Sequence, residues 1–332
     1  MFDSCVIRGR SFAPARFCAP LAGFTHSAFR RLLAEFGGTG AVWTEMLAGR
    51  QILREDFQAS PWLRRRPEEK NLVYQLMIRP GDPLPCILDR LGENGVEAVD
   101  LNLACDAMSI RACEAGSALF ENLEGMREVV TEMRRHWPGI FTVKIRLGGR
   151  RPDWEHRFLD RLKIIEDAGV DALTLHPRFF EDKFKRRARH ELVPWATSRT
   201  RLPIIANGDL AGAGHVTTQA EHLSGACAIM IGRMAIVRPW IFASWNMATP
   251  CHVDLAETWH RMLRFIEEDF EPAIALRRMQ MFTKYFAANF AFGHRFYHDI
   301  ANAPSIGTAK ERAAAFFSRV PATVSHPVVA GL

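Results

Sequence analysis

The sequence predicts an α/β fold, a closed (β/α)₈ TIM barrel followed by a C-terminal all-helical domain. Eight short apolar runs alternate with amphipathic stretches between residues 17 and 245, which is the pattern of parallel strands joined by helices. From residue 253 to residue 317 only helical periodicity remains. A chain of 332 residues has room for one large domain and one accessory domain.

Each expected strand is an apolar run that ends at turn-forming residues. The eight runs are residues 17–21, 41–46, 71–77, 98–104, 141–147, 172–176, 203–207 and 226–232. Apolar residues recur at three- and four-residue spacing in four segments between them, which predicts helices at residues 84–94, 126–136, 155–168 and 215–223. We expect a catalytic barrel domain of residues 1–250, a helical domain of residues 251–332, and a loosely held tail after Arg319.

The composition is that of an ordinary globular protein, with 48% hydrophobic and 24% charged residues. No apolar run reaches the ~18–20 residues that a membrane helix needs, and residues 1–16 lack the apolar core of a secretory signal, so we expect a cytoplasmic protein. Seven scattered cysteines without a C-x-x-C pair argue against a disulfide framework and a structural metal site. The net charge of +6 favours a polyanionic partner without deciding it.

Polar residues stand at or near the ends of five consecutive expected strands. They are Gln75, Asn102, Lys144, His176 and Asn207. Because barrel active sites lie at the carboxyl ends of the strands, this set predicts a ring of side chains around a polar planar ligand. Lys144 is flanked by apolar residues, and a buried lysine needs an anionic or electron-rich partner, such as the ring edge of a reduced flavin.

Glycines follow the seventh and eighth expected strands, in Asn207-Gly208-Asp209 and Gly232-Arg233. They permit close approach of the backbone, and with the start of a short helix they predict a phosphate site. A phosphate site beside an electron-rich ring points to flavin mononucleotide (FMN).

Cys105 directly follows the fourth expected strand. Taken alone, such a cysteine is more often a small buried hydrophobic residue than a catalyst, although its position is one where barrels keep catalytic groups. The neighbouring Asp106 would disfavour the thiolate if it pointed inward, and would be a turn residue if it pointed outward.

Two basic runs are expected in loops on the active face, Arg64-Arg65-Arg66 and residues 183–189. Such runs are compatible both with solvated loops and with an anionic partner. A third group of basic residues lies in the helical region and is interleaved with aromatic residues. We interpret the aromatic residues mainly as the core of that domain. The aromatic residues are Phe282, Tyr285, Phe286, Phe290 and Phe296.

Several short motifs occur in one order along the chain. They are Ala19-Pro20-Leu21-Ala22-Gly23-Phe24-Thr25, Thr44-Glu45-Met46, Asp100-Leu101-Asn102-Leu103-Ala104-Cys105, Ala115-Gly116-Ser117-Ala118-Leu119, Val143-Lys144-Ile145-Arg146, His176-Pro177-Arg178, Ile205-Ala206-Asn207-Gly208-Asp209, Gly232-Arg233 and Pro239-Trp240-Ile241-Phe242. In this order and spacing the sequence resembles the tRNA-dihydrouridine synthase family, FMN-dependent (β/α)₈ enzymes with a helical RNA-binding domain. His26, Ala104, Asp106 and Arg238 replace the family's usual Asp, Gly, Pro and Asn, which indicates a divergent member.

The resemblance implies reduction of the 5,6 double bond of uridine in tRNA, with NADPH reducing FMN, flavin N5 passing hydride to C6, and Cys105 protonating C5 as the catalytic acid. It implies a cofactor site made by Ala19, Pro20, Leu21, Gln75, Lys144, His176, Asn207, Gly208, Asp209, Gly232 and Arg233. It implies substrate contacts from Asn102, Arg178, Arg277, Arg278 and Lys284, with tRNA as the partner. We expect a monomer.

Two other functions remain open from the sequence. One is an FMN-dependent barrel enzyme that acts on a small molecule, which would need neither the helical domain nor the basic runs. The other is a flavin-containing RNA-binding homologue that has lost catalysis, against which the presence of Cys105 speaks.

Overall fold

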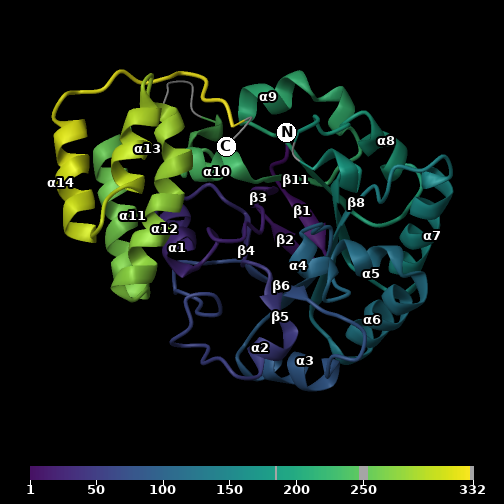
Figure 1. Ribbon diagram of the computed structural model, residues 1–332. Coiled ribbons are helices and arrows are strands. Elements are labelled where there is room, and N and C mark those ends of the chain that lie inside the picture. The colour runs from purple at the N-terminus through teal and green to yellow at the C-terminus, as the bar shows by residue number, and fades with distance from the viewer. Residues whose placement is uncertain (184, 247–252, 330–332) are drawn as a thin grey trace.

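The chain forms a closed parallel barrel with helices outside it and a bundle of helices docked on one side (Figure 1). The computed structural model describes residues 1–183, 185–246 and 253–329. Neighbouring strands follow the order β4-β3-β11-β10-β9-β8-β7-β6, and pairing of β4 with β6 closes the barrel. The predicted fold class is confirmed.

Each of the eight expected strands is present. They are β3 (Arg16–Cys18), β4 (Ala41–Trp43), β6 (Leu72–Met77), β7 (Ala98–Leu103), β8 (Ile140–Arg146), β9 (Ala172–His176), β10 (Ile204–Asn207) and β11 (Ala228–Ile231). A two-residue strand, β5 (Leu47–Ala48), also pairs with β6. All residues of β7 and β8 are buried, because a parallel strand in this fold is covered on both faces.

Helices cover the outside of the barrel. They are α1 (Ser27–Phe36), α2 (Gly49–Ile52), α3 (Leu84–Glu93), α4 (Met108–Arg111), α5 (Ser117–Glu121), α6 (Leu123–His136), α7 (Trp154–Asp167), α8 (Leu192–Thr197), α9 (Ala213–Thr218) and α10 (Arg233–Val237), with short 3₁₀ turns η1 (Phe180–Asp182), η2 (Glu221–Leu223) and η3 (Ala243–Asn246). The helices expected at residues 84–94, 126–136 and 155–168 are confirmed as α3, α6 and α7.

The single helix expected at residues 215–223 is wrong, because this segment is divided between α9 and η2. The hydroxyl groups of Thr217 and Thr218 donate to the carbonyl groups of Ala213 and His215 at 3.0 and 2.8 Å. Threonine side chains that bond back to the helix in this way weaken the helical continuation.

An antiparallel hairpin, which the strand patterns did not reveal, precedes the barrel. Its strands are β1 (Cys5–Ile7) and β2 (Arg10–Phe12), joined by Arg8 and Gly9, both with positive φ. Two such residues form the turn that matches the twist of a hairpin. Phe12 packs in one cluster with Phe17 and Trp43 from the barrel interior, so the hairpin closes the amino-terminal end of the barrel.

The helical domain contains α11 (Leu255–Asp269), α12 (Pro272–Phe286), η4 (Ala287–Asn289), α13 (Gly293–Ala301) and α14 (Ile306–Phe317). Among the expected core aromatic residues, Phe282, Phe286, Phe290 and Phe296 are buried. The expected domain boundary at residues 250 and 251 lies outside the described residues. No helix in the described part of the chain has the length and apolarity required to cross a membrane.

The first basic run joins the helical domain to the barrel. Arg64 and Arg66 both donate to Oδ1 of Asp269 in α11, at 3.1 and 2.5 Å, and the Ser27 hydroxyl of α1 donates to Oδ2 of Asp269. His26 lies in the same interface with its ring edge-to-face on Phe270 at 4.9 Å. Burial lowers the pKa of His26 well below its usual value, so this residue is a neutral interface side chain.

The expectation of a loosely held tail is wrong for residues 322–325. The amide of Ala291 donates to the carbonyl of Ala322 at 2.9 Å, and the amide of Val324 donates to the carbonyl of Asn289 at 2.8 Å. Residues 321–329, which we call the C-terminal segment, run from the helical domain back towards α10 (Figure 1). Backbone pairing to another part of the chain therefore fixes the first residues of this segment, and no local sequence pattern reports such pairing.

Candidate active site

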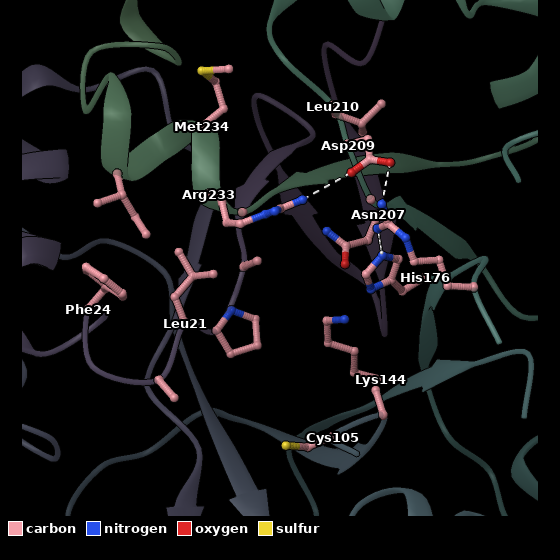
Figure 2. A pocket seen from close by; sticks show the side chains of 18 of the residues that line it. Leu21, Phe24, Cys105, Lys144, His176, Asn207, Asp209, Leu210, Arg233 and Met234 are labelled. Atoms are coloured by element: carbon pink, nitrogen blue, oxygen red, sulfur yellow. Dashed lines mark hydrogen bonds and ion pairs between the residues drawn. The ribbon is translucent and has the colours of Figure 1, made fainter. Parts of the chain in front are cut away.

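A cavity of about 380 Å³ opens among the carboxyl ends of the barrel strands. Fourteen of the seventeen predicted site residues line it: Ala19, Pro20, Leu21, Gln75, Asn102, Cys105, Lys144, His176, Arg178, Asn207, Gly208, Asp209, Gly232 and Arg233. Figure 2 shows Cys105 and Lys144 on one side of the cavity, and Asp209 and Arg233 on the other. The cavity thus has a thiol end and an arginine end.

A chain of side-chain hydrogen bonds lies beneath the thiol end. Gln75 Nε2 donates to Asp100 Oδ2 at 2.8 Å, and Asn102 Nδ2 donates to Gln75 Oε1 at 2.9 Å. Asn102 Oδ1 then accepts from the backbone amide of Cys105 at 2.9 Å. Burial raises the pKa of Asp100 to about 6, so its carboxylate is mostly ionised at neutral pH.

The loop that carries Cys105 is held from its other side as well. The amide of Ser117 donates to the Cys105 carbonyl at 2.9 Å, and a Cβ at Gly116, where φ is +59°, would lie 2.6 Å from that oxygen. Asp106 Oδ1 accepts from the Ser117 hydroxyl at 2.8 Å and from Arg111 at 2.9 Å. Of the two orientations open from the sequence, Asp106 adopts the outward one and stabilises this loop.

Lys144 lies directly opposite Asn102 in the pairing of β7 with β8. Burial and the positive charge of Arg146 lower the pKa of Lys144 to about 7. Arg146 also lines the cavity and pairs in register with His176 of β9. The cavity therefore holds an amine that changes charge near neutral pH.

Four residues form an ion-pair network at the arginine end. Arg178 is 2% exposed and contacts His176 Nε2 and Asp209 Oδ2, while Arg233 Nη2 lies 3.3 Å from Asp209 Oδ1. Burial, with the charge of Lys144, lowers the pKa of His176 well below its usual value. Since the guanidinium is always a donor, His176 accepts at Nε2 and its neutral ring carries the proton on Nδ1.

Asp209 remains charged in this network. Burial alone would raise the pKa of Asp209, but the hydrogen bonds from Arg178 and from the amide of Ala188 outweigh it and hold the pKa below its usual value. Gly208, where φ is +113°, precedes it, and a Cβ there would lie 2.8 Å from His176 Cδ2. The glycine is thus required by the position of the histidine ring.

The three other predicted substrate residues lie on α12 outside the cavity. Arg277 is exposed and Lys284 is half-buried. Arg278 lies over the Phe270 ring at 5.5 Å and forms an ion pair of 3.6 Å with Glu45. Arg278 thus belongs to the interface between the helical domain and the barrel.

The predicted site omits several cavity residues. Arg146 is two residues from Lys144 in the same strand, and the two-residue period of strands was a signal that it faces the same way. Tyr285 of α12 and Val329 of the C-terminal segment also line the cavity, but they come from parts of the chain whose placement has no local signal.

Comparisons with known proteins agree with this geometry. Residues 17–317 match the family model described as dihydrouridine synthase. The chain is 31% identical over 229 residues to tRNA-dihydrouridine synthase B of Escherichia coli (strain K12), covering 68% of each protein. It is 28% identical over 226 residues to tRNA-dihydrouridine synthase B of Pasteurella multocida (strain Pm70), covering 68% of this chain and 67% of that protein.

A solved structure shows the same fold. The old yellow enzyme homologue of Zymomonas mobilis superposes with a TM-score of 0.51 at 14% identity, over 78% of this chain and 95% of that one. At this identity the likeness concerns the barrel fold alone. The extent of the family match and the identity to its members decide the assignment: this chain belongs to the dihydrouridine synthase family.

Proposed function

We propose that this protein is a tRNA-dihydrouridine synthase, which reduces the 5,6 double bond of a uridine in tRNA with FMN as cofactor and NADPH as reductant. The observation that carries the proposal is the thiol end of the cavity. There Cys105 and Lys144 line one wall, and Asn102, opposite Lys144 in register, binds the amide of Cys105. The family membership and the names of its relatives give the substrate class.

The residues present suit a flavin mononucleotide. A cavity of about 380 Å³ is within the usual range for small-molecule sites. Lys144 would face the electron-rich edge of the ring system, and Asn207, Gly208 and Arg233 would surround the phosphate at the arginine end. When bound there, FMN would supply the hydride that C6 of the uracil ring receives.

Cys105 would supply the proton to C5. A well-placed general acid contributes about 10²- to 10⁴-fold in rate. The hydrogen bonds at its amide and its carbonyl hold the Cys105 backbone from both sides. This double attachment fixes the backbone from which the thiol extends, which limits the positions that Sγ can take.

Arg178 would act through its neighbours. Its guanidinium contacts His176 and Asp209 and donates to the carbonyl of Arg186. We therefore assign it as a positioning residue that sets the tautomer of His176, in place of the direct nucleotide contact expected from the sequence.

The helical domain would bind the RNA. A uridine inside folded tRNA must leave its stack, at a cost of a few kcal/mol, and contacts with phosphates offset such costs. α12 carries both Tyr285, which lines the cavity, and the exposed Arg277. The same helix would thereby join the RNA surface to the reaction site.

The test is mass-spectrometric mapping of dihydrouridine in tRNA from a strain that lacks the gene. We expect dihydrouridine to disappear from at least one position and to return with the wild-type gene. The matched variants are Cys105→Ala and Cys113→Ala, since Cys113 is an exposed cysteine of the same loop. Cys113→Ala should restore the modification. Cys105→Ala should lower the rate of dihydrouridine formation about 100-fold and should leave the amount of bound flavin unchanged.

Two results would count against the proposal. Dihydrouridine unchanged at every position in the deletion strain would favour an inactive homologue or an enzyme acting on a small molecule. Full restoration by Cys105→Ala would remove the thiol from the reaction.

A further inference from the structure

We infer that the C-terminal segment, residues 321–329, completes the arginine end of the cavity and forms part of the binding site for the phosphate of the cofactor. The inference rests on the proposed function, because it takes the occupant of the cavity to be FMN. It adds a segment of the helical domain to a site otherwise built mainly by the barrel.

The near end of the segment is fixed by backbone bonds. Ala322 and Val324 bond to Ala291 and Asn289, and an isolated bridge pairs Thr323 with Phe290. Asn289 is 2% exposed, and its Nδ2 donates to the carbonyl of Val237 at the end of α10. The segment is thereby connected to the helix that begins with Arg233.

Arg238 provides a second attachment. Its Nη2 donates to the carbonyl groups of Val324 and Ser325 at 2.7 and 2.9 Å, and its Nε donates to Asn289 Oδ1 at 3.2 Å. An asparagine, the residue that the resemblance leads one to expect here, is too short to reach these carbonyl groups in the same way. The arginine at position 238 therefore supplies an attachment for the segment that an asparagine would not supply.

The far end of the segment reaches the cavity. Val329 is one of the lining residues, and its carbonyl oxygen lies 3.4 Å from Arg233 Nη1. The other terminal nitrogen of the same guanidinium faces Asp209. The segment thus contacts the side chain that we assign to the phosphate, and position 329 lies on the cavity wall at that end.

A charge test follows from this placement. A carboxylate at position 329 would lie near the cofactor phosphate and weaken FMN binding, by about tenfold for like charges several ångströms apart in a partly desolvated site. The matched control is Val328→Asp, because Val328 is 70% exposed and is not one of the lining residues. Riboflavin, which has the same ring but no phosphate, separates a phosphate effect from a general one.

The experiment titrates the full-length apo-protein with FMN and with riboflavin, following flavin fluorescence, for wild type, Val329→Asp and Val328→Asp. We expect Val329→Asp to raise the Kd for FMN about tenfold, and to change the Kd for riboflavin less than about twofold. Val328→Asp should leave both values within about twofold, and the loss in Val329→Asp should shrink at high salt.

A second variant tests the attachment. Arg238→Ala removes the donors to Val324 and Ser325, and we expect faster release of FMN measured by transfer of flavin to an excess of an apoflavodoxin trap. Arg319→Ala, which removes an arginine just before the segment, is the control and should release FMN at the wild-type rate.

Equal effects of the two aspartate variants on the Kd for FMN would overturn the inference. Tighter FMN binding in Val329→Asp would also overturn it, because that result means that the segment competes with the cofactor. A wild-type protein that binds riboflavin as tightly as FMN would also overturn it. A wild-type protein that binds neither flavin would instead refute the proposed function itself.

Discussion

Lys144 is a buried amine whose charge depends on what lies against it. Its pKa of about 7, set by burial and by Arg146, means that the apo-protein at or below neutral pH holds an ammonium group in an unfavourable place. A bound anionic partner would relieve this cost. The same residue therefore destabilises the protein without ligand and favours binding of an anionic ligand.

The substitution Lys144→Met should therefore stabilise the apo-protein in a pH-dependent way. The folded pKa of about 7 lies below the ordinary lysine pKa of 10.5, so between these values the unfolded chain binds more protons and wild-type stability rises with pH. The gain from Lys144→Met should be on the order of 3 kcal/mol at pH 6 and should disappear towards pH 10. Thermal unfolding of the apo-proteins from pH 6 to pH 10 measures it.

Lys163→Met is the control, because Lys163 is exposed and pairs with Asp167 on α7. It should change stability by less than about 1 kcal/mol at each pH. A gain from Lys144→Met that grows with pH would contradict the assigned direction of the pKa.

Sequence reasoning succeeded best for single residues at strand ends. Asn102 and His176 were predictable because every barrel strand delivers its carboxyl end to one face. Arg278 and His26 were not, because Arg278 pairs with Glu45 and His26 packs on Phe270, and each partner is more than two hundred residues away in the chain. Nothing near His26 in the sequence reports that contact.

At the scale of elements, the side chain of Asp269 in α11 connects this helix with α1 and with the loop of residues 51–70. Its side chain is fully buried and receives Arg64, Arg66 and Ser27. Removing one partner of such a buried charge group leaves the others uncompensated, which typically costs about 3–5 kcal/mol.

We expect Asp269→Ala to lower the free energy of unfolding by about that amount and to expose the loop of residues 51–70 to protease. Urea unfolding and limited proteolysis measure the two effects. The adjacent Glu268→Ala removes a carboxylate that pairs with Arg31 at the surface and should cost less than about 1 kcal/mol. Similar losses of unfolding free energy in both variants would show that Asp269 does not hold these elements together.

Elements with strong internal periodicity were predictable, and those stabilised from outside were not. α6 and α7 have amphipathic repeats along their whole length. The hairpin β1–β2 has only three residues in each strand, and the C-terminal segment has no repeat at all. The hairpin is held by packing of Phe12 with Phe17 and Trp43, and the C-terminal segment is held by backbone bonds to Asn289 and Ala291. A local pattern contains neither of these contacts.

At the scale of the whole molecule, the net charge of +6 favours association with RNA, and its distribution can be tested. Removing two exposed or half-exposed cations of α12, in Arg277→Ala with Lys284→Ala, should reduce the slope of log affinity for tRNA against log salt by about 1–2. The control is Arg127→Ala with Arg135→Ala, two exposed arginines of α6 on the far side of the barrel (Figure 1). Filter binding across a salt series measures both.

Equal slopes for the α12 and α6 variants would place the RNA surface elsewhere. Arg278 is left intact because its loss would disturb the contact of the helical domain with Glu45 and Phe270.

The architecture itself was predictable from the alternation of strands and helices and the order of the motifs. The docking of the helical domain on α1 was not, because it depends on pairs such as Arg64 and Asp269 that are 205 residues apart.

The hydrogen-bond chain from Asp100 also determines what the cavity can select. An ionised carboxylate only accepts, so it fixes the amide of Gln75 with its NH₂ towards Asp100, and thereby fixes Asn102. Gln75 Oε1 accepts from Asn102, and Asn102 Oδ1 accepts from the amides of Ala104 and Cys105, so each of the two side chains keeps one further amide hydrogen to donate. We therefore expect the two amide groups to offer donors to a bound molecule, which would suit the carbonyl groups of the proposed uracil substrate.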